Sequence, residues 1–376
     1  MRKVSLRNVA VNDRLAVDIR IESPLPDVQY RLRIDRGTQL KPKHINRLKE
    51  EGVRSVFVVD PATKDLSSYI RDEDLEAVER ETIQNLRTTA EALREDNLYK
   101  LPAEELSDTI QNLIDTIKDS SVSMAYSSLK SHTDYLAKHQ FDVCRLSLHY
   151  VLVYQDELIE KYRTEYSQGD LSRDEFTEVL GMGTLLHDIG NWEIPQETLE
   201  KRKELTDTEW EAIKQHPRLG FDIMGNLDDV NRLARMPALH HHERYSGQGY
   251  PKGRSGKDIH LLGRIAAICD VYTALTSERP YRVKLTPNRA IEIMKDMQNG
   301  DEKAFEPDLM QKFLDIMPPY PIGQDVVLSD GTRGVVCGLD EGFETPRVRV
   351  LFEENQKLDD YYEIVANVSE SPDILN

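Results

Sequence analysis

Apolar and polar residues are patterned with a short period near the start of the chain and with a helical period further on. Four runs in the first 60 residues are rich in β-branched and other apolar residues and favour strands. They occupy residues 9–11, 16–21, 30–34 and 53–59. Residues 43–51 have helical character, and Gly52 follows them as a stop signal. Strand runs before the helix and one strand run after it predict a small α/β module over residues 1–60, with a turn at Arg36-Gly37.

Residues 61–123 are acidic and read as helical. The stretch up to residue 121 contains no glycine, and Pro102 is its only internal break. Apolar residues recur near helical spacing, so we expect one face of this helix to pack against another part of the protein. They are Leu106, Ile110, Leu113, Ile114 and Ile117. The pattern allows a connector, a dimer-forming or signal-relaying stalk, or one more helix of the bundle that follows.

Residues 124–317 predict a helical bundle. Runs with helical periodicity alternate with clusters of glycine, proline and serine, and we find no convincing strand pattern. The runs lie around residues 146–158, 175–186, 207–215, 232–242, 262–275 and 288–297. Thr206 is placed to cap the run that begins at Asp207.

The last segment, residues 318–376, follows a proline-rich linker and returns to a strand pattern. Short apolar runs are separated by turn signals such as Asp330-Gly331. The runs lie at residues 325–329, 334–338 and 347–352. They predict a small antiparallel β-barrel. The fold class is therefore mainly α, a bundle flanked by an N-terminal α/β module and a C-terminal barrel.

Composition and charge narrow the class of protein. With 39% hydrophobic and 31% charged residues the chain fits a globular protein, and neither a secretory signal nor a membrane span is evident. We therefore expect a cytoplasmic protein, in which the three separated cysteines are core residues. The net charge of −18 argues against binding a nucleic-acid polymer. An anionic small ligand is compatible with this net charge if metal ions or arginines at the binding site offset the negative potential of the protein.

Histidines beside acids mark the candidate chemistry. The adjacent pair His187-Asp188 accompanies His139, His216, a run of three histidines at 240–242, and Asp270. Neutral imidazoles with carboxylates suit first-row metals such as iron or manganese, whereas structural zinc sites more often use cysteine. A carboxylate can bridge two ions, and such a pair activates water near neutral pH. The pattern predicts hydrolysis of a phosphate ester.

Several motifs in one order make the interpretation specific. HDIG stands at 187–190, Ile194-Pro195 follows, and KQHP stands at 214–217 with Gly220 after it. Then come HHE at 241–243, GQGYP at 247–251, DVY at 270–272 and RPYR at 279–282. Over residues 125–317 the chain resembles the HD-GYP branch of the HD phosphohydrolase superfamily.

The resemblance implies a helical bundle with two, sometimes three, iron or manganese ions that hydrolyses cyclic di-GMP to pGpG and then GMP. Matched by motif, the metal ligands are His139, His187, Asp188, His216, His241, His242 and Asp270, with Asp188 as the bridging and catalytic carboxylate. Tyr135 stands where three-metal members place a glutamate, which favours two metals. His240 is expected not to bind metal, because three adjacent helical residues cannot aim at one point.

Substrate contacts are implied by two further motifs. Tyr250, in the glycine-rich loop 246–251, would shape the site, and Arg279 and Arg282 would bind phosphate oxygens or a guanine edge.

Three positions depart from the family pattern. Asn191 replaces a lysine that would contact the scissile phosphate, Ser246 replaces an aspartate of the loop, and Thr273 replaces an aspartate that would contact guanine. Asn191 can donate a hydrogen bond but supplies no charge, at a cost of a few kcal/mol of transition-state stabilisation.

Three hypotheses follow from these departures. The first is a cyclic di-GMP phosphodiesterase, with activity reduced by Asn191. The second is a slow or inactive relative that binds metal and cyclic dinucleotide as a sensor. The third is an enzyme for another cyclic dinucleotide or phosphate ester, suggested by Thr273. The oligomeric state, including a homodimer, stays open.

Overall fold

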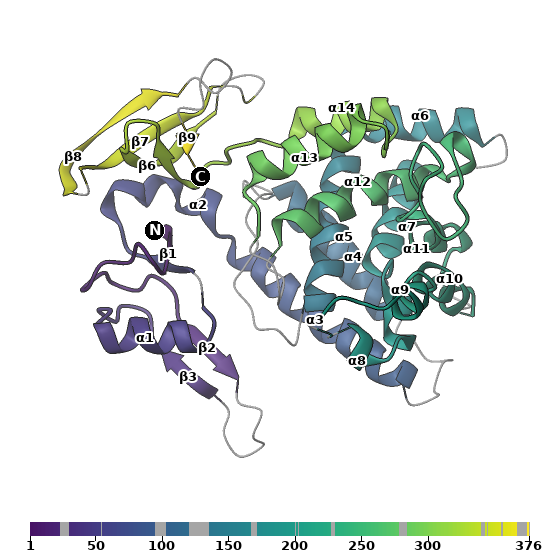
Figure 1. The fold of residues 1–376 in the computed structure, drawn as a ribbon, viewed down its shortest axis with the longest axis horizontal. Helices are drawn as coiled ribbons and strands as arrows, with labels where there is room; N and C mark the ends of the chain where they lie inside the picture. Colours follow the sequence, from purple (N-terminus) through teal and green to yellow (C-terminus); the bar gives the residue numbers. More distant parts are fainter. Residues whose placement is uncertain are drawn as a thin grey trace. The chain divides into compact units, whose positions relative to one another are not determined.

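The structure, a computed structural model, divides into two compact units (Figure 1). It describes residues 1–22, 30–53, 55–94, 103–119, 135–166, 171–199, 201, 203–226, 230–277, 284–339, 343, 345–354, 356–366 and 374–375. Among these, unit 1 takes the residues up to 72 and from 318 onward, and unit 2 takes those between. The finer division at residues 60, 123 and 317 stays a prediction.

The N-terminal part of unit 1 has four short strands and one helix. Their bounds are β1 (Arg2–Ser5), β2 (Ile19–Glu22), β3 (Tyr30–Ile34), α1 (Pro42–Glu50) and β4 (Ser55–Val58). β1 pairs with β4 and β2 with β3, both antiparallel. Leu15, Leu40 and Leu48 lie fully buried in the core between them. The helix and its glycine stop are confirmed, and Gly52 has a φ of +77°.

The strand expected at residues 9–11 is wrong, because a turn occupies this place. The Asp13 carboxylate accepts the N–H of Ala10 at 2.8 Å, and Asn12 takes a φ of +81°. A hydrogen bond from the backbone to a nearby side chain competes with strand pairing. The three apolar residues 9–11 therefore form a turn and no strand.

The C-terminal part of unit 1 is a five-stranded antiparallel sheet. Its strands are β5 (Asp325–Leu328), β6 (Arg333–Gly338), β7 (Arg347–Glu353), β8 (Gln356–Val365) and β9 (Ile374–Leu375), in the order β8-β7-β6-β5-β9. The predicted turn at Asp330-Gly331 is present, with a φ of +86° at the glycine. Within the described residues no pairing joins β8 to β9, so closure into a barrel stays a prediction.

The N-terminal and C-terminal parts of unit 1 pack against each other. The Arg349 guanidinium donates to both carboxylate oxygens of Asp65, at 2.8 and 2.9 Å, and to Glu363 at 2.8 Å. Leu66 and Ile70 share a buried apolar cluster with Val335 and Leu351. The α/β module and the sheet therefore pack as one body. Between them run the one-turn elements η1 (Pro61–Leu66) and α2 (Ser67–Ile70).

Unit 2 is helical. The helices are α3 (Glu73–Arg94), α4 (Ala103–Asp119), α5 (Tyr135–Val153), α6 (Gln155–Glu165), α7 (Arg173–Leu185), η3 (Ile189–Glu193), α8 (Gln196–Leu199), α9 (Asp207–Ile213), α10 (His216–Gly225), η4 (Arg232–Ala234), α11 (Arg235–His240), η5 (Gly256–Asp258), α12 (Leu261–Thr276), α13 (Pro287–Asn299) and α14 (Pro307–Ile316). The expected helical bundle is confirmed. None of the described helices combines the length and apolarity needed to cross a membrane.

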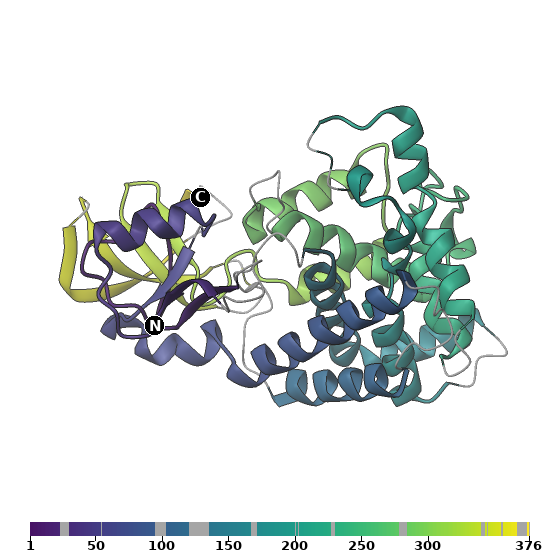
Figure 2. The same cartoon turned by 90° about the horizontal axis from the view of Figure 1, so that it is seen from below.

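Helices α3 and α4 lie side by side and pack on α5 and α7 (Figure 2). Leu106, Ile110 and Leu113 of α4 are buried, as their spacing predicts. A Cβ at Gly181 of α7 would lie 2.9 Å from the Ile110 side chain, so the glycine permits close approach of these helices. Of the readings for this segment, the packing favours further helices of the bundle.

Helices α5 and α12 form the centre of the bundle and carry the residues of the site described below. From Leu261 to Thr273 every residue of α12 is buried, and α5 is buried from His139 to Leu148. Burial raises the pKa of the Cys144 and Cys269 thiols to about 12, as expected for cysteines that fill the core.

Candidate metal centre

Seven side chains from five parts of the bundle converge in its interior. His139 comes from α5, His187 and Asp188 from the turn after α7, and Asp270 from α12. His216 begins α10, and His241 and His242 follow the end of α11. They form two groups, and within each the ligating atoms lie within 4.8 Å of one another. The structure thus brings together all seven residues predicted as metal ligands.

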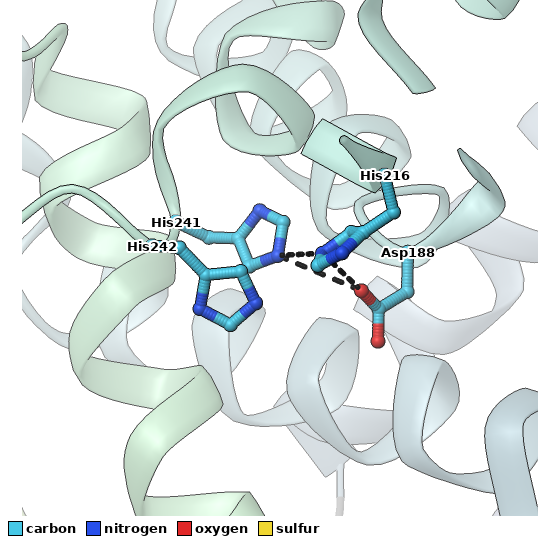
Figure 3. Close-up of side chains that lie close together, drawn as sticks. All are labelled: Asp188, His216, His241 and His242. Carbon is cyan, nitrogen blue, oxygen red and sulfur yellow. Dashed lines mark hydrogen bonds and ion pairs between the residues drawn. The ribbon is translucent and has the colours of Figure 1, made fainter. Parts of the chain in front are cut away.

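The first group holds Asp188, His216, His241 and His242 (Figure 3). Asp188 Oδ1 lies 3.2 Å from Nε2 of His216 and 3.5 Å from Nε2 of His241. The two imidazole Nε2 atoms lie 3.2 Å from each other. Three atoms that can accept a hydrogen bond or bind a cation therefore face one point.

The second group holds His139, His187 and Asp270. His139 Nε2 lies 2.9 Å from Asp270 Oδ1, and His187 Nε2 lies 4.0 Å from the same oxygen. The His187 Nε2 atom is buried and has no hydrogen-bond partner among the described residues. A buried nitrogen left without a partner is uncommon in native proteins and is satisfied if it binds an ion.

Asp188 stands between the two groups. While its Oδ1 faces His216 and His241, its Oδ2 lies 3.5 Å from His187 Nε2 and 4.0 Å from His139 Nε2. The two oxygens thus serve different groups, which is the arrangement needed to bridge two ions.

Backbone carbonyls fix the orientation of three of the rings. Nδ1 of His187 lies 2.7 Å from Thr184 O, Nδ1 of His216 lies 2.7 Å from Ile213 O, and Nδ1 of His241 lies 2.9 Å from Pro237 O. A carbonyl only accepts, so each Nδ1 carries the proton and each Nε2 lone pair faces inward. Lone pairs that converge with a carboxylate fit a metal ion.

Burial and neighbouring groups set the charges of the centre. Burial lowers the pKa of His187 to about 4, so its ring is neutral near pH 7. Burial opposes ionisation of Asp188, but His187, His216 and His241 outweigh it and hold its pKa well below the ordinary value. Burial likewise opposes ionisation of Asp270, but the hydrogen bond from His139 leads the effects that lower its pKa. Burial opposes protonation of His241 too, but its hydrogen bond to Asp188 outweighs burial and raises the pKa of His241. A metal ion would displace that proton, because neutral imidazoles and ionised carboxylates are the forms that bind iron or manganese.

Two glycines allow the ligand-bearing segments to approach. A Cβ at Gly190 would lie 2.1 Å from the carbonyl oxygen of His216, and one at Gly263 would lie 2.4 Å from His240 Cβ. His240 packs there against the start of α12, and its Nδ1 accepts the His260 N–H at 3.2 Å. It belongs to neither group of potential ligands, and the expectation that it does not bind metal stays a prediction.

The loop after α11 is anchored on a buried carboxylate. Glu243 accepts the backbone N–H groups of Lys252 and Arg254, both at 2.9 Å. A Cβ at Gly249 would lie 2.4 Å from His242 O, so only glycine fits there. The loop carries Tyr250, whose ring stacks on His242 with centroids 4.6 Å apart. Sequence reasoning assigned no role to Glu243, although an acid beside two ligands was a signal for it.

The segment that matches a known family contains all seven of these side chains. Residues 131–303 match the family model described as HD domain. This segment of the chain is similar to HD domains. The resemblance to HD-GYP proteins is thereby confirmed, and the relatives below support it.

Curated relatives align with the HD domain and its surroundings. "Cyclic di-GMP phosphodiesterase PA4108" of Pseudomonas aeruginosa is 35% identical over 231 residues, which cover 61% of this chain and 51% of that protein. "3'3'-cGAMP-specific phosphodiesterase 3" of Vibrio cholerae is 34% identical over 142 residues, 37% of this chain and 30% of that protein. The chain thus spans about half the length of the first relative and less of the second.

Among solved structures, "Bd1817, a HDG"Y"P protein from Bdellovibrio bacteriovorus" has a similar fold. The TM-score is 0.50 with 16% sequence identity, over 84% of this chain and 98% of that one. At this identity the likeness concerns the fold alone.

Two of the three positions that depart from the family pattern follow predicted metal ligands closely in the sequence. Asn191 is 6% exposed in η3, three residues after Asp188, and Thr273 is 4% exposed in α12, three residues after Asp270. The buried Ser246 hydroxyl has no hydrogen-bond partner among the described residues. Arg279 and Arg282, predicted to bind substrate, lie outside the described residues.

Tyr135 stacks against His139, with ring centroids 5.8 Å apart and an interplanar angle of 10°. An aromatic ring thus lies beside the second group at the position discussed for a third metal ligand. The number of ions stays a prediction of two.

Proposed function

We propose that this protein is a metal-dependent phosphodiesterase that hydrolyses cyclic di-GMP to pGpG and then to GMP. The observation that carries the proposal is the position of Asp188, whose two oxygens face two separate groups of inward-facing histidine nitrogens. Relatives whose names describe cyclic dinucleotide phosphodiesterases support the choice of substrate.

Two iron or manganese ions would be held by the seven converging residues, with Asp188 shared. When bound, such a pair polarises a phosphoryl oxygen and lowers the pKa of water toward neutrality. The chain contributes rigidity, because backbone carbonyls orient His187, His216 and His241 before anything binds.

Other residues would act on the substrate. The Asn191 amide would donate a hydrogen bond to a phosphoryl oxygen, Tyr250 would line the site, and Arg279 and Arg282 would bind phosphate or guanine. In each hydrolysis the oxygen of water bonds to phosphorus, the bond to the ribose 3′ oxygen breaks, and that oxygen takes up a proton. The first cleavage opens the ring to pGpG, and the second yields two GMP.

Product analysis tests this function. Protein loaded with Mn²⁺, or with Fe²⁺ under reducing conditions, is incubated with cyclic di-GMP, and nucleotides are separated by anion-exchange chromatography. We expect pGpG to form first and GMP later. Metal-loaded protein that binds cyclic di-GMP without releasing either product would contradict the proposal.

Two observations favour specific alternatives. Asn191 favours a sensor that binds the dinucleotide and turns it over slowly or not at all. Thr273 and the cGAMP-specific relative favour a different cyclic dinucleotide as substrate. Turnover of cyclic di-GMP and 3'3'-cGAMP, measured side by side, separates these functions. The cytoplasmic location and the homodimer stay predictions.

A further inference from the structure

One of the two tryptophans of the chain is exposed close to the metal centre. Trp210 lies on α9 and is 45% exposed, whereas Trp192 is 9% exposed. Single exposed apolar side chains are common on protein surfaces, so the exposure of Trp210 gains meaning only from the residues beside it.

Trp210 is the outermost ring of a series that leads inward to the first group of ligands. Its ring centroid lies 6.2 Å from that of Tyr250 in an edge-to-face arrangement. Tyr250 in turn stacks on His242, and the His242 ring lies 4.1 Å from that of His241. The indole thus stands two rings away from the ligand His242.

Short-range interactions hold α9, and therefore the indole, in place. The Thr206 hydroxyl accepts the N–H of Glu209, and the Glu209 carboxylate accepts the N–H of Thr206 at 2.7 Å. Lys201 pairs with the same carboxylate, and Lys214 pairs with Glu211. With Lys201 and Lys214 engaged by acids, the indole is the feature of α9 best suited to contact an uncharged aromatic group.

We propose that Trp210 is a specificity-determining residue that stacks on one nucleobase of the cyclic dinucleotide. The inference rests on the proposed function, because a phosphodiester must lie at the metal centre for its base to reach outward. A nucleotide bound there has its charged phosphate at the ligands and its planar base one ribose away. Stacking is tolerant of base identity, since every base has a π-face. Trp210 therefore selects nucleotide substrates over other phosphodiesters without distinguishing guanine from adenine.

Steady-state kinetics tests the proposal. The metal-loaded full chain is compared with Trp210→Ala, with the conservative Trp210→Phe, and with Val153→Ala, a control residue that is 50% exposed at the end of α5. Loss of one base stack is expected to raise the KM for cyclic di-GMP at least about fivefold. Phe should restore most of the loss, and Val153→Ala should leave KM unchanged. A KM for Trp210→Ala within twofold of the wild type, in a wild type that turns over, would overturn the inference.

Fluorescence gives a readout that does not depend on turnover. The hydrolysis-resistant bisphosphorothioate analogue of cyclic di-GMP should quench wild-type tryptophan emission, and Trp210→Phe, which keeps Trp192, should lose this quench. A quench that persists in Trp210→Phe would contradict the stack. A wild type that shows the Trp210-dependent quench without hydrolysis would end the proposed enzymatic function and leave the stack in place. A wild type that neither binds nor cleaves would overturn both.

Discussion

Replacing Asp188 by asparagine tests the bridging role most sharply, because the change keeps the shape and removes one charge. Its two oxygens lie 3.2–3.5 Å from His216 and His241 and 3.5–4.0 Å from His187 and His139. In either amide orientation, asparagine presents an N–H₂ group to one of the two sides. One group of ligands is then disabled, and both lose the shared negative charge.

The expected magnitude follows from that charge. A unit charge about 4 Å from a cation contributes about 4 kcal/mol at an effective dielectric of about 20. This corresponds to about 10³-fold in affinity for each ion. Asp188→Asn is therefore expected to retain about one ion per chain or fewer after dialysis, and to lose about 10³-fold in kcat.

Inductively coupled plasma mass spectrometry after dialysis measures the metal, and product chromatography measures kcat. The control is Asp222→Asn on the exposed face of α10, where the same substitution breaks only a surface pair with Arg218. It should match the wild type in both assays. An Asp188→Asn variant that keeps two ions per chain and a kcat within tenfold of the wild type would refute the bridging role.

Three further variants test other parts of the account. Asn191→Lys should raise kcat about 10- to 100-fold, because an ammonium supplies the positive charge that the amide lacks; an unchanged kcat in a variant with full metal content would count against this role of residue 191. Glu243→Gln should raise KM and lower stability by about 1–3 kcal/mol, because one of the two loop N–H groups loses its acceptor. Calorimetry measures the stability and steady-state kinetics measures KM. An unchanged melting temperature would show that the anchor is dispensable. His260, whose pKa burial lowers from 6.5 to about 4, contributes stability that is present above pH 6.5 and lost as pH falls toward 4, since only the unfolded chain takes up the proton there. His260→Asn keeps an acceptor at the start of α12 and should flatten the fall in melting temperature between pH 6.5 and 4, whereas an unaltered pH profile would contradict this assignment.

Much of the site was readable from the sequence because its ligands stand in short motifs. HDIG, HHE and the separate His216 and Asp270 each have a local signature, and the structure brings them together as the resemblance implied. The reason why these motifs contain glycines becomes clear only from the three-dimensional structure. Gly190 is needed because the His216 carbonyl, 26 residues away in the sequence numbering, would lie 2.1 Å from a Cβ.

The parts that were missed depend on contacts between distant residues or on main-chain pairing. Strand β8 is exposed along most of its length and is held by its ladder to β7, so its side chains carry little apolar pattern. The pairing of Arg349 with Asp65 joins the N-terminal and C-terminal parts of unit 1, and no local sequence pattern predicts it. Nothing in the sequence around Trp210 distinguishes it from other residues of a predicted helix. Only the three-dimensional structure places its ring beside that of Tyr250.

The most direct test of the central claim is metal stoichiometry measured together with product formation on one preparation of the full chain. After reconstitution with Mn²⁺, or with Fe²⁺ under reducing conditions, we predict about two ions per chain and the appearance of pGpG followed by GMP. A protein that takes up no iron or manganese, or that holds two ions and leaves cyclic di-GMP intact, would contradict a two-metal phosphodiesterase.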